Sequence, residues 1–130
     1  MEFKLIIPGR PVAKRRPRFA RRGKFVMTYN DQETEEGRVL WEVKQQWKTE
    51  AIDGPIKCYF KFFMPWPKSI SEKKKSLLPR HVKRPDLDNL LKFYKDVFTG
   101  TVWKDDSQVW AISAIKAYHE NPQTEIILEW

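Results

Sequence analysis

Apolar residues recur at steps of three, four and seven between residues 87 and 98, which is the spacing of one face of an α-helix. Pro85 biases Arg84 away from helical backbone, and Gly100 follows the apolar stripe, so start and stop signals flank the segment. The pattern therefore predicts a helix over residues 87–98 whose apolar face packs against the core. The residues on that face are Leu87, Leu90, Leu91, Tyr94, Val97 and Phe98.

Elsewhere apolar and polar residues alternate with the period of two that indicates β-strands. Four strands are predicted, at about residues 1–7, 56–64, 108–118 and 125–130. The third has apolar residues on both faces, which is typical of an interior strand, and a turn at residues 119–123 predicts that it pairs with the last strand as a hairpin. A longer helix is predicted at about residues 31–48, and a short helical piece at about 71–78.

Together these elements predict an α/β fold, more narrowly an α+β fold with a mixed sheet. The predicted order is β-α-β-α-β-β, with the last two strands as a hairpin. A chain of 130 residues has the length of a single compact domain and is long enough to bury a core, so we expect one domain over residues 1–130.

Composition narrows the classes of site and partner. No stretch has the apolar length of a membrane span or the pattern of a secretory signal, so we expect a cytoplasmic protein with no membrane partner. The single Cys58 cannot form an intramolecular disulfide, and His81 and His119 do not have the spacing of a zinc site. Any metal must be bound by oxygen ligands, and we expect no small-molecule cofactor.

The positive charge gathers in one irregular segment. The net charge of +8 at pH 7 favours a polyanionic partner, and residues 8–25 interleave basic residues with three prolines that interrupt any regular period. We expect an extended basic arm or loop that follows a phosphate backbone, with Phe19 and Phe25 anchoring it or stacking on unpaired bases. The alternative is a solvated loop with no DNA contact. With the basic pair before Asp86 included, the predicted DNA-binding residues are Lys14, Arg15, Arg16, Arg18, Lys83 and Arg84.

Two acidic pairs bracket the predicted helix: Asp86 and Asp88 begin it, and Asp105 and Asp106 follow it. Residues at i and i+2 of a continuous helix point about 200° apart, so the first pair converges only if Asp86 lies in extended backbone before the helix. Paired aspartates with room for water and phosphate are typical Mg²⁺ ligands. The alternative is that these residues only cap the helix and that Asp88 pairs with Lys92.

The two-part pattern of these segments resembles the signature DLDNLxK…WxDDxQV of the RusA family of Holliday-junction resolvases. In this chain it reads Asp86-Leu-Asp-Asn-Leu-Leu-Lys92, followed by Val102-Trp-Lys-Asp-Asp-Ser-Gln-Val109. With a weaker likeness in the first strand, the basic arm and the last strands, the resemblance covers nearly the whole chain. It implies a RusA-like fold and a homodimeric, Mg²⁺-dependent endonuclease, often encoded by prophages, that nicks four-way junctions symmetrically in DNA recombination and repair.

Carried over residue by residue, the resemblance implies roles for both acidic pairs. The implied catalytic residues are Asp86, Asp88, Lys92 and Asp106, and the implied metal ligands are Asp86, Asp88, Asp105 and Asp106. Lys92 lies one helical turn after Asp88, where its charge would face the scissile phosphate or position the water. We expect a tight turn to return Asp106 to Asp86 and Asp88. One such site per chain and two nicks per junction require a homodimer.

Other functions stay open at this stage. A non-catalytic nucleic-acid-binding domain would bind DNA without cutting it, and a less specific branched-DNA nuclease would also cut linear duplex. A phosphotransferase that carries a DxD motif after a buried strand fits less well, because here the motif follows a basic, proline-marked loop and opens a helix.

Overall fold

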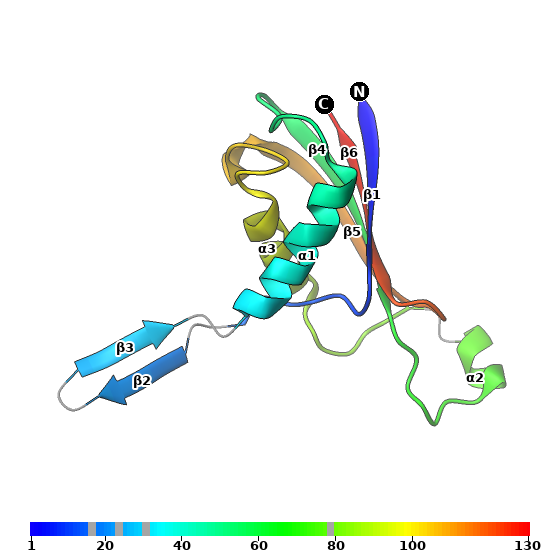
Figure 1. Ribbon diagram of the computed structural model, residues 1–130. Coiled ribbons are helices and arrows are strands. Elements are labelled where there is room, and N and C mark those ends of the chain that lie inside the picture. The colour runs from blue at the N-terminus through cyan, green and yellow to red at the C-terminus, as the bar shows by residue number, and fades with distance from the viewer. Residues whose placement is uncertain (16–17, 23–24, 30–31, 78–79) are drawn as a thin grey trace.

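A four-stranded sheet with two helices packed on one face forms the body of the protein (Figure 1). The computed structural model describes residues 1–130 apart from 16–17, 23–24, 30–31 and 78–79. In chain order the elements are β1 (Glu2–Pro8), β2 (Arg18–Arg22), β3 (Phe25–Tyr29), α1 (Glu33–Gln46), β4 (Ile56–Met64), α2 (Glu72–Leu77), α3 (Leu87–Phe98), the 3-10 helix η1 (Asp106–Gln108), β5 (Val109–Tyr118) and β6 (Gln123–Glu129).

The main sheet has the strand order β1-β6-β4-β5. Strands β1 and β4 both pair antiparallel with β6, whereas β4 and β5 are parallel. A parallel pair needs a crossover connection, and the segment that contains α2 and α3 supplies it. The predicted fold class, α+β with a mixed sheet, is confirmed.

Strand β4 supplies the centre of the core. Its alternating residues Ile56, Cys58, Phe60, Phe62 and Met64 are all buried, as the period of two predicts. Burial also raises the pKa of the Cys58 thiol to about 12, because the low-dielectric core disfavours the thiolate. Cys58 is therefore a core residue and not a reactive thiol.

Helix α3 has the predicted bounds and lies across the core face of β4. Its fully buried residues are Leu90, Phe93, Tyr94 and Phe98. The rings of Phe98 and Phe60 stack with their centroids 6.3 Å apart, and those of Tyr94 and Phe62 lie 5.7 Å apart. Helix α1 packs on the same face through Val39 and Val43, whereas α2 lies away from it (Figure 1). No helix among the described residues is long and apolar enough to cross a membrane.

The predicted hairpin of the last two strands is wrong, and so is the interior position of the segment at residues 108–118. Strand β5 lies at the edge of the sheet, and β4 separates it from β6. β5 pairs in parallel with β4 along its whole length, and the His119 N–H extends this ladder by donating to the Met64 carbonyl at 3.0 Å. The chain then passes the end of β4, and β6 pairs antiparallel with β4 and β1 on the other side.

The basic arm is also more regular than its prolines predict. Strands β2 and β3 pair antiparallel in a second, two-stranded sheet that projects from the helical side of the body (Figure 1). All three prolines of the arm precede β2, so every residue of β2 and of β3 keeps its backbone N–H for pairing. The predicted contacts of Arg16 and of the Arg18, Phe19 and Phe25 side chains lie outside the described residues.

A buried hydroxyl ties three segments together. Tyr94 Oη on α3 accepts a hydrogen bond from the Val12 N–H at 3.0 Å, and Thr124 Oγ1 on β6 donates to it at 3.0 Å. Burial raises the pKa of the Tyr94 phenol, so the hydroxyl stays protonated well above neutral pH. The start of the basic arm is thus fixed to α3 and to the sheet.

The substitution Tyr94→Phe should lower the free energy of unfolding by about 1–3 kcal/mol, because it keeps the ring but leaves the buried Val12 N–H unpaired. Urea denaturation measures the change. Tyr118→Phe is the matched control, since the Tyr118 ring stacks on Trp66 and its hydroxyl has no hydrogen bond to a described residue. Equal losses for the two variants would contradict the role given to the Tyr94 hydroxyl.

Candidate active site

Asp86 occupies the N-cap position of α3 but does not cap the helix. Its backbone is extended, with φ −69° and ψ 145°, and its side chain makes no capping hydrogen bond. This is the backbone condition under which Asp86 and Asp88 converge on the same end of the helix. Because the carboxylate makes no capping hydrogen bond, the interpretation that it only caps α3 does not hold.

Asp88 and Lys92 lie on the first two turns of α3. Their side chains are exposed, as is that of Asp86. The salt bridge between Asp88 and Lys92 that a purely structural role requires is not formed in the described part of the chain. Both groups are therefore available to a ligand in the structure.

A groove of about 530 Å³ opens beside Asp86. It is lined by Arg84 and Pro85 from the preceding loop, by Asn89 on α3, and by Arg10 from the segment after β1. The sequence predicts Arg84 at this place, but not Arg10 or Asn89. Asn89 could have been identified from the sequence, because it lies within the DLDN pattern. Arg10 could not, because it is one basic residue among many.

Lys116 of β5 holds the loop that precedes Asp86. Its Nζ donates to the carbonyls of Lys83 and Pro85, each at 2.8 Å. Lys116 therefore acts as a positioning residue for Asp86, and sequence reasoning missed it because it reads as one position of a strand. Lys83 itself is exposed next to Arg84, so both predicted phosphate contacts point to solvent beside the acidic pair.

Positive charge dominates this end of α3. His81 is buried in the loop before Lys83, and its Nδ1 has no hydrogen-bond partner among the described residues. Burial, followed by the charges of Lys116 and Arg10, lowers the pKa of His81. The positive charges of Lys116 and Arg10 near this loop favour bound anions.

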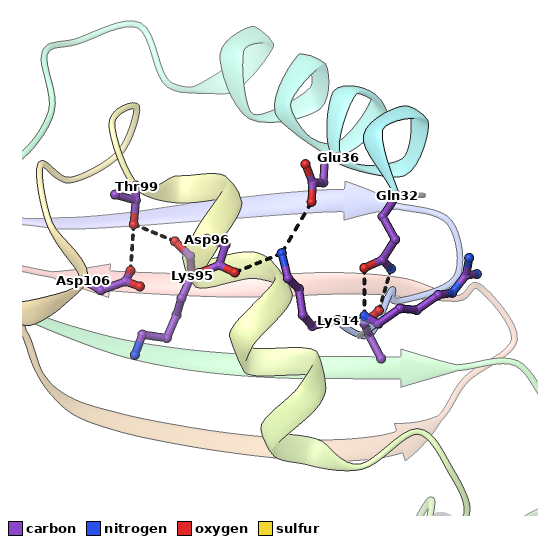
Figure 2. Close-up of polar contacts among 9 residues, drawn as sticks. Lys14, Gln32, Glu36, Lys95, Asp96, Thr99 and Asp106 are labelled. Carbon is purple, nitrogen blue, oxygen red and sulfur yellow. Dashed lines mark hydrogen bonds and ion pairs between the residues drawn. The ribbon is translucent and has the colours of Figure 1, made fainter. Parts of the chain in front are cut away.

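Asp106 lies at the other end of α3. Its Oδ1 accepts a hydrogen bond from Thr99 Oγ1 at 2.7 Å (Figure 2). It also accepts one from the buried Trp103 Nε1 at 3.1 Å. Asp105 caps η1 by accepting from the Ser107 N–H at 2.9 Å. The two carboxylates of the second pair are thus already oriented by the turn that carries them.

Within one chain, the expectation that Asp106 returns to Asp86 and Asp88 is wrong. Asp88 lies ten residues before the end of α3, which corresponds to about 15 Å along the helix axis. The turn cannot span that distance because it closes on the helix end, with the Val102 N–H bonded to the Phe98 carbonyl at 2.9 Å. Accordingly, no three His, Cys, Asp or Glu side chains of the described residues gather in a potential metal site.

Each end of α3 nevertheless offers carboxylate oxygens of the kind that hold Mg²⁺. Hard divalent cations prefer oxygen ligands, and Mg²⁺ commonly uses one or two carboxylates and completes its shell with water and substrate phosphate. The uncommitted Asp86 and Asp88 fit that requirement as a pair. Asp105 and Asp106 provide a second, separate set of oxygens.

Gln108 holds the turn that carries Asp105 and Asp106. Its Nε2 donates to the carbonyls of Ile52 and Gly54 at 2.8 and 2.9 Å, and its Oε1 accepts from the Asp105 N–H at 2.8 Å. Within the WxDDxQV pattern, Gln108 and Trp103 hold the turn in place, whereas Asp105 and Asp106 offer carboxylates. The sequence pattern identifies these positions, but it does not show which residues hold the turn and which ones offer carboxylates.

Two predicted DNA-binding residues at the base of the arm have partners inside the protein. Lys14 Nζ lies 3.2 Å from Asp96 Oδ2 and 3.6 Å from Glu36 Oε1, and it bridges α3 and α1 (Figure 2). Arg15 pairs with Glu35 at 3.4 Å. These contacts compensate much of their charge, so DNA contacts by these two residues stay predictions.

Comparisons with known proteins identify the family of this chain. The family model of endodeoxyribonuclease RusA matches residues 8–129, which include both acidic pairs and the basic loop. The uncharacterized protein YqaN of Bacillus subtilis (strain 168) is 35% identical over 134 residues, covering 97% of this chain and 94% of that protein. The chain therefore belongs to the RusA family of endodeoxyribonucleases, which act on Holliday junctions.

Proposed function

We propose that this protein is a Mg²⁺-dependent, structure-specific endonuclease that resolves four-way DNA junctions by paired symmetric nicks, in recombination and repair. The observation that carries the proposal is the uncommitted carboxylate of Asp86, next to Asp88 and inside a basic groove. A domain that only binds DNA would gain nothing from exposed carboxylates there, because they repel phosphate.

The residues at the N-terminus of α3 have different proposed roles in the hydrolysis of the phosphodiester. Asp86 and Asp88 would hold Mg²⁺, which when bound supplies positive charge at the phosphate and lowers the pKa of a coordinated water. Lys92, one turn further along α3, places a second positive charge near the scissile phosphate or orients the attacking water. Lys83 and Arg84 hold the strand against the acidic pair.

We further propose that two chains act together as a homodimer. Two opposed nicks need two sites, and the two acidic pairs of one chain lie at opposite ends of α3. A two-fold arrangement with antiparallel α3 helices brings Asp86 and Asp88 of one chain beside Asp106 of the other, and it does so twice. Each site would then take ligands from both chains.

The edge of the sheet at β5 offers a surface for such a pairing. β5 connects the Asp106 end of α3 to the Asp86 end, and an edge strand presents unpaired backbone groups to a second chain. Its large apolar residues Trp110, Ile112 and Ile115 are exposed, Trp110 to 70%. Trp41 on α1 is also exposed, whereas Trp47 is buried in the core.

A cleavage assay tests the activity. With Mg²⁺ the protein should nick a synthetic four-way junction and leave linear duplex intact, and chelation should stop the reaction. Asp86→Asn or Asp88→Asn should lower the nicking rate by about two orders of magnitude or more, with junction binding intact or tighter because a negative charge near phosphate is lost.

Glu72→Gln is the control, since Glu72 is an exposed carboxylate that pairs with Lys75 on α2, away from α3 (Figure 1). Undiminished cutting by the Asp86 variant would refute the assigned site. Equal cutting of junction and linear duplex would indicate a general nuclease, and binding without any cutting would favour the non-catalytic domain.

Mixed dimers test whether each site is shared between chains. Co-expressed chains that carry Asp86→Asn and Asp106→Asn, purified through two different tags, should recover nicking of one junction strand, because one composite site keeps all its ligands. Each variant alone should be inactive. A mixed dimer as inactive as its parents would place both acidic pairs in the same chain's site.

Thr99→Val tests how the second pair is held. Loss of the hydroxyl that donates to Asp106 should lower nicking about 10- to 100-fold and raise the Mg²⁺ concentration needed for half-maximal rate. Thr101→Val, in the same turn, is the control, because its side chain contacts no acidic residue through a hydrogen bond in the described structure. Identical behaviour of the two variants would argue against a positioning role for Thr99.

A further inference from the structure

We infer that Arg10 is a phosphate-binding residue of the groove beside Asp86, where it holds the backbone of the strand that is cut. The inference rests on the proposed function and names a part of the substrate that this site binds. It assigns the segment after β1 to the active-site groove, separately from the β2-β3 hairpin.

Arg10 stands where two cavities join. The first, about 690 Å³, runs along the segment after β1 and is bounded on α1 by Glu35 and Arg38. The second, about 530 Å³, contains Asp86. Both are lined by Arg10 and Pro85, so together they form one groove that leads from α1 to the acidic pair.

The backbone on both sides of Arg10 is fixed. Before it, Gly9 has φ +93° and donates its N–H to the Pro122 carbonyl at 3.1 Å. After it, the Val12 N–H is bonded to the Tyr94 hydroxyl. The backbone at Arg10 is therefore held at the groove by anchors on both sides, so ligand binding requires no further ordering of this backbone.

Arg38 supports this wall of the groove. Its Nη1 donates to the Pro8 carbonyl at 2.9 Å, and its guanidinium lies so close to Gly9 that an added Cβ would approach it to 3.2 Å. The positive φ favours glycine at this position, and a side chain would also crowd Arg38. Arg38 donates a hydrogen bond to the backbone, whereas the Arg10 guanidinium is available to a ligand in the groove.

Charge separates the arginines of the groove into two groups. Arg15 is paired with Glu35, and Arg38 is bonded to backbone. Arg10 and Arg84, in contrast, are exposed and have no ion pair with any described residue. These two uncompensated guanidinium groups flank Asp86, and guanidinium forks bind phosphate oxygens in a bidentate manner.

The occupant is a nucleic-acid strand because of where the groove ends. A phosphate held by Arg10 and Arg84 lies beside the carboxylates proposed to act on the neighbouring phosphodiester, and the groove continues past Arg10 toward α1, where the strand would run on. A free phosphate or nucleotide would use the arginines but not the length of the groove.

Arg10→Gln in the full-length protein tests the inference through binding, without metal. The affinity for a synthetic four-way junction should fall about ten-fold, as expected for a lost charge-assisted hydrogen bond. The slope of log K against log salt concentration should become shallower by about 0.9, the value for one lost phosphate contact. Arg10→Lys should keep the slope and part of the affinity. Nicking with Mg²⁺ should fall in parallel with binding.

Lys44→Gln is the matched control, since it removes the same charge from the exposed last turn of α1, about 14 Å along the helix from Glu35. It should change neither affinity nor slope. An unchanged slope for Arg10→Gln, with urea unfolding at the wild-type midpoint, overturns the inference whatever happens to nicking. If the wild-type protein cuts no DNA but Arg10→Gln still flattens the slope, the proposed function fails while the phosphate contact stands.

Discussion

The packing of α3 on the core face of β4 is the interaction on which the rest of the structure depends. Aromatic contacts such as Tyr94 on Phe62 hold a twelve-residue helix as a rigid rod, with an acidic pair at each end. Because the rod is fixed along its length, the pairs stay about 15 Å apart in one chain. The Tyr94 hydroxyl adds the segment after β1 to the same assembly, which places Arg10 at the Asp86 end.

The parts of the fold that sequence predicts are those with a local physical signal. The bounds of α3 and β4 follow from periods of 3.6 and 2, and the residues of the acidic pairs are visible in the chain itself. The sheet order is different, because the parallel pairing of β4 with β5 joins residues far apart in sequence. The position of Asp106 at the C-terminal end of α3 likewise depends on hydrogen bonds of Trp103 and Gln108, which cannot be predicted from the period of apolar residues.

The sequence gives the number of charged residues, but it does not show which of them pair with each other in the fold. The basic arm reads as a uniform run, yet the structure uses Lys14 to bridge Glu36 and Asp96 and pairs Arg15 with Glu35. The basic residues that form no ion pair within the described structure are the ones available to bind a polyanion. In the groove beside Asp86 that charge comes from Arg10 and Arg84, so the proposed phosphate contacts lie next to the proposed metal ligands.

In the proposed homodimer, the length of α3 is itself a functional parameter. One residue more would move the Asp106 end by about 1.5 Å and rotate it by about 100° relative to Asp86. A site confined to one chain could absorb such a change in a flexible turn, but the turn here is closed by Gln108 and by the helix end. In a dimer with antiparallel helices the same change would enter both sites at once. A rigid helix of fixed length is what two chains need if each is to complete the other's site.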